Sequence, residues 1–83
     1  MLFTIDRAIV CAVYGGFAPQ ADPRTAVARR NIDQTVEGAL ASGVRTREQV
    51  KAKMYDVIQL AMYEEPRAEL VANWNVCRDS FVR

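Results

Sequence analysis

The stretch LASGVRTREQV, residues 40–50, constrains the fold most, because it holds a helix stop and a helix start a few residues apart. Gly43 predicts the end of one helix, since glycine adopts the left-handed conformation of a C-terminal cap without steric cost, and Val44 is expected to fold back onto the last turn. Thr46 with Gln49 three residues later forms a capping box, which predicts the start of the next helix. The sequence therefore predicts a helical hairpin centred on Gly43.

The remaining turn signals divide the chain into segments of helical length. Asp22 before Pro23 is a favourable helix start, and Pro66 suits the beginning of a last helix. No linker or internal repeat separates domains. The sequence predicts one all-α domain over residues 1–83, a compact bundle of four short helices at about 4–14, 23–42, 47–63 and 66–82.

The first of these segments, residues 4–14, is ambiguous. Thr4 could cap a helix, but the run AIVCAVY could equally form a buried strand. A helix is favoured because a lone strand would have no partner among three helices. The segment lacks a polar face, which predicts that it lies at the centre of the bundle or forms the contact of a homodimer.

The apolar positions of the other helices define the expected core. In the second helix, Arg29 and Asp33 are expected to pair on a polar flank. Met54 and Met62 could form an adaptable binding groove with Tyr55, Tyr63 and Trp74, but core packing is the favoured interpretation. The expected core stripe of the third helix comprises Val50, Met54, Val57, Ile58, Ala61 and Met62, and that of the fourth comprises Leu70, Trp74, Cys77 and Phe81.

The side chains that most enzymes need are missing. The sequence contains no histidine, which is the commonest general base and the commonest metal ligand. Its two cysteines lack the spacing of a zinc site, and YGGFAP lacks the Lys and Ser/Thr of a phosphate-binding loop. Glu64 and Glu65 are expected to be surface charges that complement the dipole of the last helix. We therefore expect a protein that is not an enzyme and has no catalytic residues, metal site or cofactor.

Cys11 and Cys77 allow two interpretations. They could form a disulfide, but both lie among apolar residues, where free cysteine behaves as a small hydrophobe, and reduced core thiols are favoured. Residues 7–21 resemble a signal peptide only superficially, since Asp6 neutralises Arg7 and Pro19 is misplaced for cleavage. Residues 8–17 are too short to span a membrane. A cytoplasmic protein is expected, with a periplasmic or secreted one as the alternative.

Residues 39–58 resemble the helix-turn-helix of DNA-binding proteins. Ala39 lies four residues before the turn glycine, but the apolar residue of the second helix, Val50, comes one position later than in that pattern. The resemblance implies that a recognition helix would read bases through its first residues while flanking basic groups contact phosphates. The candidate contacts to nucleic acid or another partner are Arg45, Arg47, Gln49, Lys51 and Lys53.

Two functions follow in order of preference. The first is a small helical protein of inhibitor or regulator type that binds another protein of unknown identity, as phages and mobile elements often encode. The second is a DNA-binding regulator that uses residues 45–53. The nearly balanced charge, with 11 basic and 10 acidic residues, favours neither function by itself.

Overall fold

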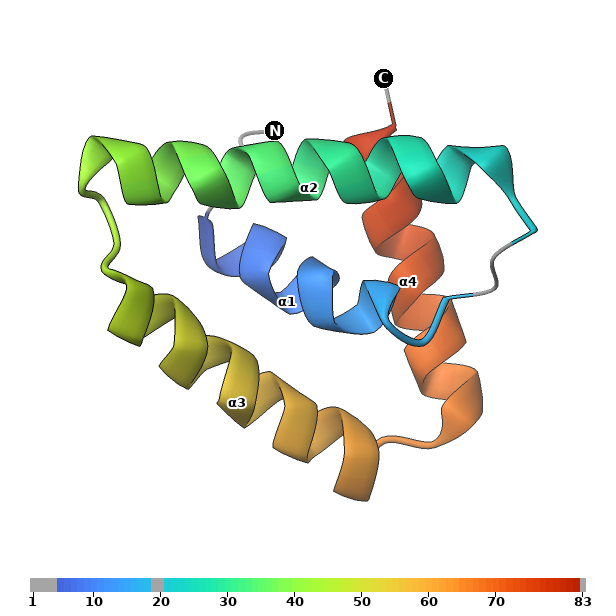
Figure 1. The fold of residues 1–83 in the computed structure, drawn as a ribbon. Coiled ribbons are helices and arrows are strands. Elements are labelled where there is room, and N and C mark those ends of the chain that lie inside the picture. Colours follow the sequence, from blue (N-terminus) through green and yellow to red (C-terminus); the bar gives the residue numbers. More distant parts are fainter. Residues whose placement is uncertain (1–4, 19–20, 83) are drawn as a thin grey trace.

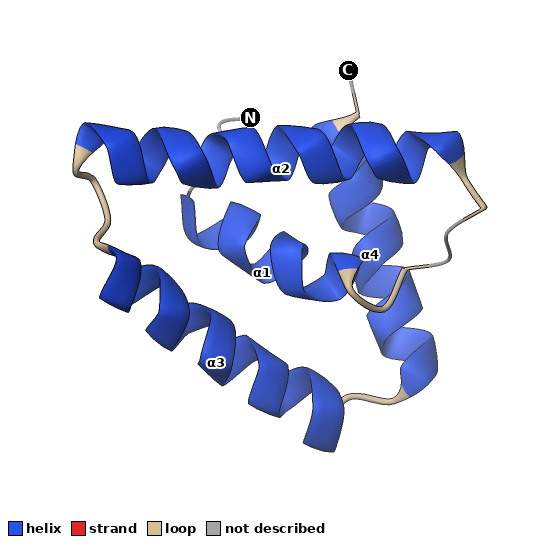
Figure 2. Ribbon diagram, viewed as in Figure 1, coloured by secondary structure: helices blue, strands red, loops and turns tan. Residues whose placement is uncertain are grey.

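The computed structural model describes residues 5–18 and 21–82, and the regular secondary structure of this part of the chain is entirely helical, with loops between the helices (Figures 1 and 2). The predicted all-α bundle is confirmed. Thr4, the expected first cap, lies outside the described residues, and Pro66 caps the last helix instead of opening it. The elements are α1 (Ile5–Gly15), α2 (Pro23–Ser42), α3 (Arg47–Tyr63) and α4 (Arg67–Phe81).

Helix α1 occupies the centre of the fold (Figure 1). It packs against α2, α3 and α4, whereas α3 packs chiefly against α1. The ambiguity of residues 4–14 is thus resolved in favour of a helix over the part that is described. The apolar side chains of α1 that suggested a homodimer contact are largely covered within the chain, because Ala8, Ile9 and Cys11 have almost no exposed surface.

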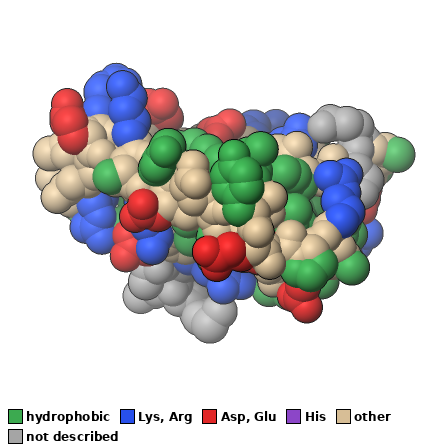
Figure 3. Space-filling view, turned by 90° about the horizontal axis from the view of Figure 1, so that it is seen from below, with side chains coloured by type: hydrophobic (Ala, Val, Ile, Leu, Met, Phe, Trp, Pro, Cys, Tyr) green, Lys and Arg blue, Asp and Glu red, His purple; other side chains and the backbone are tan. Residues whose placement is uncertain are grey.

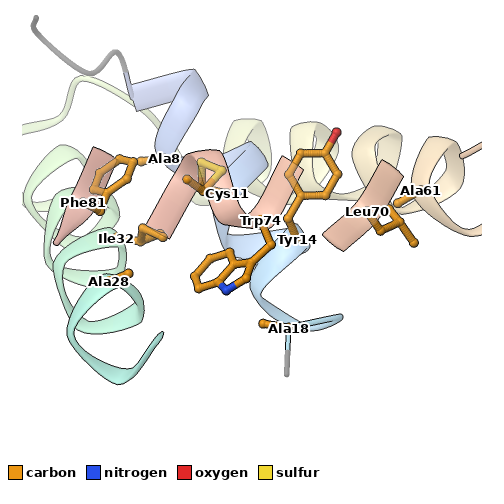
Figure 4. Close-up of a cluster of buried hydrophobic side chains, with 11 residues drawn as sticks. Ala8, Cys11, Tyr14, Ala18, Ala28, Ile32, Ala61, Leu70, Trp74 and Phe81 are labelled. Carbon is orange, nitrogen blue, oxygen red and sulfur yellow. A yellow bond between two sulfur atoms is a disulfide. The ribbon is translucent and has the colours of Figure 1, made fainter. Parts of the chain in front are cut away.

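The core is assembled around Trp74 of α4, which is completely buried (Figure 4). The cluster joins it to Ala28 and Ile32 of α2 and to Tyr14 of α1. The indole nitrogen of Trp74 has no hydrogen-bond partner among the described residues. The side chain therefore acts as an apolar anchor, as its position in the predicted stripe of the fourth helix implies.

Cys11 and Cys77 form a disulfide between α1 and α4, so the expectation of reduced thiols is wrong. The two Cα atoms are 5.6 Å apart, within the usual range for a bridged pair. Both cysteines are almost fully buried, as expected, but their sulfur atoms meet between the two helices. The linear sequence does not reveal which faces of two helices meet. Whether the two cysteines form a bridge or remain separate core thiols depends on that contact.

The hairpin between α2 and α3 has the predicted geometry in its backbone. Gly43 has a φ of 77°, and the backbone N–H groups of Gly43 and Val44 donate to the carbonyls of Leu40 and Ala39. This is the Schellman arrangement of a helix end. The side chain of Val44 does not fold back as expected, because 60% of its surface is exposed. The capping box begins α3 as predicted, with Thr46 and Gln49 bonded in both directions.

The described residues contain neither a candidate membrane span nor a group of metal ligands. None of the helices combines the length and the apolar character that a membrane crossing needs, over the residues described. Within residues 5–18 and 21–82, no three side chains of the His, Cys, Asp or Glu type are grouped as metal ligands.

Candidate functional site

The five side chains predicted to contact a partner do not form one surface. Arg45 makes an ion pair with Asp6 of α1, with 3.1 Å between its guanidinium nitrogen and the carboxylate oxygen. The amide oxygen of Gln49 accepts a hydrogen bond from the backbone N–H of Thr46 at 2.9 Å. Both groups are therefore engaged in holding the turn and the first residues of α3.

The other three predicted contacts, Arg47, Lys51 and Lys53, are exposed on α3. Arg47 and Lys51 are four residues apart and share a side of the helix. Lys53 follows Lys51 by two positions, or about 200° of rotation, and so lies on another side. Glu48 adds an acidic side chain in the first turn of the helix. The three exposed basic groups at this end of α3 consequently lie on two sides of the helix.

An apolar surface lies farther along α3. Tyr55, Met62 and Tyr63 have 63%, 60% and 74% of their surfaces exposed, and their spacing places them on one side of the helix. We call these residues the α3 outer face. The expectation that Met62, Tyr55 and Tyr63 pack in the core is wrong, because α3 buries only the narrow stripe of Val50, Val57 and Ala61. Figure 3 shows the molecule from below, and hydrophobic side chains are exposed on this face among acidic and basic ones.

A groove runs between α2 and α3, which diverge on the two sides of α1 (Figure 1). Its volume is about 250 Å³, below the roughly 300–1,000 Å³ typical of small-molecule pockets. A second hollow of about 460 Å³ lies toward the turn and shares Glu37 with the first. We call the first hollow the α2–α3 groove. It is lined by Ile9, Ala12, Asp33, Val36, Glu37, Val50 and Met54.

Asp33 on the acidic side of this groove was expected to pair with Arg29, but Arg29 contacts another group. Arg29 donates a hydrogen bond to the carbonyl of Gly15, which lies at the end of α1 against Trp74. The predicted Arg29–Asp33 pair is absent from the ion pairs of the described residues. The exposed Asp33 and Glu37 form no ion pair with another described residue either.

A polar cluster joins α1 to the start of α4 at Glu65. The hydroxyl of Tyr14 and the amide of Asn73 each donate to one oxygen of this carboxylate, both at 3.0 Å. Glu65 is thus a half-buried acceptor and not the simple surface charge that was expected. Burial raises the pKa of the Tyr14 hydroxyl above its usual value, and the hydrogen bond and negative charge of Glu65 add to this shift. The arrangement stabilises a neutral phenol and offers no activated nucleophile.

A second polar cluster ties the start of α2 to α4. Asp22 caps α2 by accepting from the backbone N–H of Arg24, and its carboxylate also pairs with the side chains of Arg24 and Arg78. The hydrogen bonds from Arg24 lower the pKa of Asp22, with the charge of Arg78 as a smaller cause. The cap was predicted from the sequence, whereas its partner on α4 was not. This cluster is structural, because each of its charged groups faces another group of the chain.

The described residues therefore offer two surfaces for recognition, the α3 outer face and the α2–α3 groove. The sequence suggested a groove of tyrosines and methionines, whereas Asp33 was expected only as the partner of Arg29 and Glu37 was not expected at a site. The signal in the sequence was their spacing of four on one side of a helix, beside Val36. Comparison of the chain with protein-family models, curated proteins and solved structures finds no match.

Proposed function

We propose that this chain is a small non-enzymatic protein of inhibitor or regulator type that binds another protein through α3. The observation that carries the proposal is the α3 outer face. Tyr55, Met62 and Tyr63 expose most of their surfaces side by side on a helix that packs chiefly against α1. Aromatic residues and methionine are enriched where proteins meet, because they bury a large apolar area on binding.

The framework beneath this face supports the same function. The disulfide and the buried Trp74 hold α4 against the central helix α1. A rigid scaffold loses little conformational entropy when it binds, so more of the contact energy remains as affinity. The α3 outer face is displayed on a helix that packs against this bridged α1.

DNA binding through residues 45–53 remains the second proposal. The exposed Arg47, Lys51 and Lys53 support it, since basic side chains at the start of a helix can contact phosphates. It ranks below protein binding because Arg45 and Gln49 are engaged within the chain, and because Glu48 would repel a phosphate backbone. Arg45 and Gln49 would contact DNA only if these interactions within the chain were released.

The disulfide also bears on where the protein works. Stable disulfides form in oxidising compartments and are rare in the cytosol. The Cys11–Cys77 bridge therefore favours the periplasmic or secreted alternative over the cytoplasmic location expected from the sequence. Thiol titration of protein isolated from its native source tests this proposal, and two reactive thiols after unfolding would contradict it.

Affinity purification from a nuclease-treated extract of the native host tests protein binding. The oxidised chain should capture a partner in stoichiometric amount, and the double variant Tyr55→Ser/Met62→Ser should lose that partner. Val76→Ser is the matched control, because Val76 is an exposed apolar residue on α4, away from the α3 outer face. Capture that survives the double variant, or that disappears on nuclease treatment alone, would contradict the proposal.

A further inference from the structure

The α2–α3 groove combines an apolar lining with an acidic rim. Its apolar lining comes from three helices, with Ile9 and Ala12 contributed by α1, Val36 by α2, and Val50 and Met54 by α3. The remaining lining residues, Asp33 and Glu37, are both acidic, and no basic side chain lines this hollow. The basic Arg45 and Arg47 line the neighbouring hollow toward the turn. The groove is therefore suited to a ligand with both apolar and cationic groups.

The rim charges are available to such a ligand. Asp33 and Glu37 are exposed, and neither makes an ion pair with another described residue. Arg29, four residues before Asp33, is directed instead to the carbonyl of Gly15. Two like charges one helical turn apart repel each other weakly, and a cationic partner would relieve that repulsion.

We propose that the α2–α3 groove binds an amphipathic helix of a partner protein that carries Lys or Arg beside its apolar stripe. This inference rests on the proposed protein-binding function and names the chemistry of the partner. Asp33 and Glu37 are separated by about 6 Å along α2, the rise of four helical residues. A helix laid along α2 presents basic side chains at the same spacing when they are four residues apart.

The apolar part of the groove agrees with such an occupant. Met54 is half-buried at the groove, and its flexible thioether side chain can adapt to different apolar groups. The helix would insert its apolar residues between α2 and α3, as in other complexes where a helix occupies a hydrophobic groove. The small volume favours a few side chains of a macromolecule over an enclosed small molecule.

Selection from a random peptide library tests the inference without assuming a sequence. Displayed peptides of ~16 residues, about four helical turns, are selected against the full-length oxidised protein at moderate salt. The enriched peptides should place apolar residues at helical spacing and carry Lys or Arg four residues apart. Enrichment of acidic or uncharged peptides would overturn the inference, as would the absence of any enriched peptide.

Variants then locate the binding site of the enriched peptides. Asp33→Asn/Glu37→Gln should weaken binding by about three- to tenfold and reduce its salt dependence. The control Asp56→Asn/Glu64→Gln removes the same charge from two exposed positions outside the groove and should change affinity less than twofold. The reversal Asp33→Lys/Glu37→Lys should abolish binding, and circular dichroism checks that each variant remains folded.

The outcomes separate this inference from the proposed function. Peptides that bind equally well to the wild type and to both groove variants would overturn the groove as the site. If such peptides no longer bind the variant Tyr55→Ser/Met62→Ser, the α3 outer face alone is the protein-binding surface. Peptides that do not bind the groove variants but still bind the control variant would establish that the groove binds a basic helix.

Discussion

Cys11 on α1 is bonded to Cys77 on α4, and the bridge joins residues that are 66 positions apart in the chain. It lies in the same core cluster as Trp74 and connects the central helix to the last one. Because α2 and α3 lie between these two positions in sequence, the loop closed by the bridge contains most of the fold. A small domain has a limited core, and such a bridge is a common source of added stability.

Reduction of the bridge is therefore expected to destabilise the protein strongly. A loop of this length corresponds to about 4 kcal/mol of unfolding free energy in the chain-entropy treatment. Urea unfolding followed by circular dichroism, with and without a thiol reductant, measures the difference. The variant Cys11→Ser/Cys77→Ser should be similarly weakened and should not respond to the reductant. Equal transition midpoints for the oxidised and reduced wild type would contradict the prediction.

Substitution of alanine for two glycines, one at the end of α2 and one within α2, is expected to change the unfolding free energy in opposite directions. Gly43→Ala places a Cβ on a residue with a φ of 77° and should lower the unfolding free energy by about 1 kcal/mol. Gly38 lies on the exposed side of α2, four residues before its last residue, and a Cβ added there meets no neighbour, so Gly38→Ala should raise stability by roughly 0.5–1 kcal/mol. Thermal or urea unfolding distinguishes the two signs. A higher unfolding free energy for Gly43→Ala would contradict a left-handed backbone conformation at Gly43.

The raised pKa of Tyr14 predicts that the protein loses stability at alkaline pH. Its pKa in the folded state is raised above 10.0, chiefly by burial and further by Glu65. The folded state therefore favours the neutral phenol, and this contribution is complete below pH 10.0 and is lost as the pH rises through the folded pKa. Unfolding free energies measured across this range should fall more steeply for the wild type than for Tyr14→Phe. Identical alkaline slopes would show that Tyr14 is not responsible.

The helices themselves could be predicted from the sequence because their ends carry local signals. Asp22 with Pro23 marks the start of α2, Gly43 its end, and Thr46 with Gln49 the start of α3. Each signal acts through hydrogen bonds to residues within a few positions, so the linear sequence contains the whole interaction. The observed bounds of α2 and α3 accordingly agree with the prediction.

The candidate sites depend on contacts between helices, which the linear sequence does not define. Periodicity placed Met62 on the same stripe as Val57, but only the packing of α3 against α1 determines how wide the buried stripe is. The sequence also suggested that Arg29 would neutralise Asp33. The carbonyl of Gly15, brought close by α1, takes up Arg29 instead and leaves Asp33 on the rim of the groove.

The central claim is that α3 contacts a partner protein, and site-specific photocrosslinking in the native host tests it most directly. A photoreactive phenylalanine analogue is placed at Tyr55, on the α3 outer face, and at the exposed Ala72 of α4 as a control. A discrete protein adduct should form from position 55 and not from position 72. Adducts of equal yield from both positions, or nucleic acid as the product at position 55, would contradict the claim.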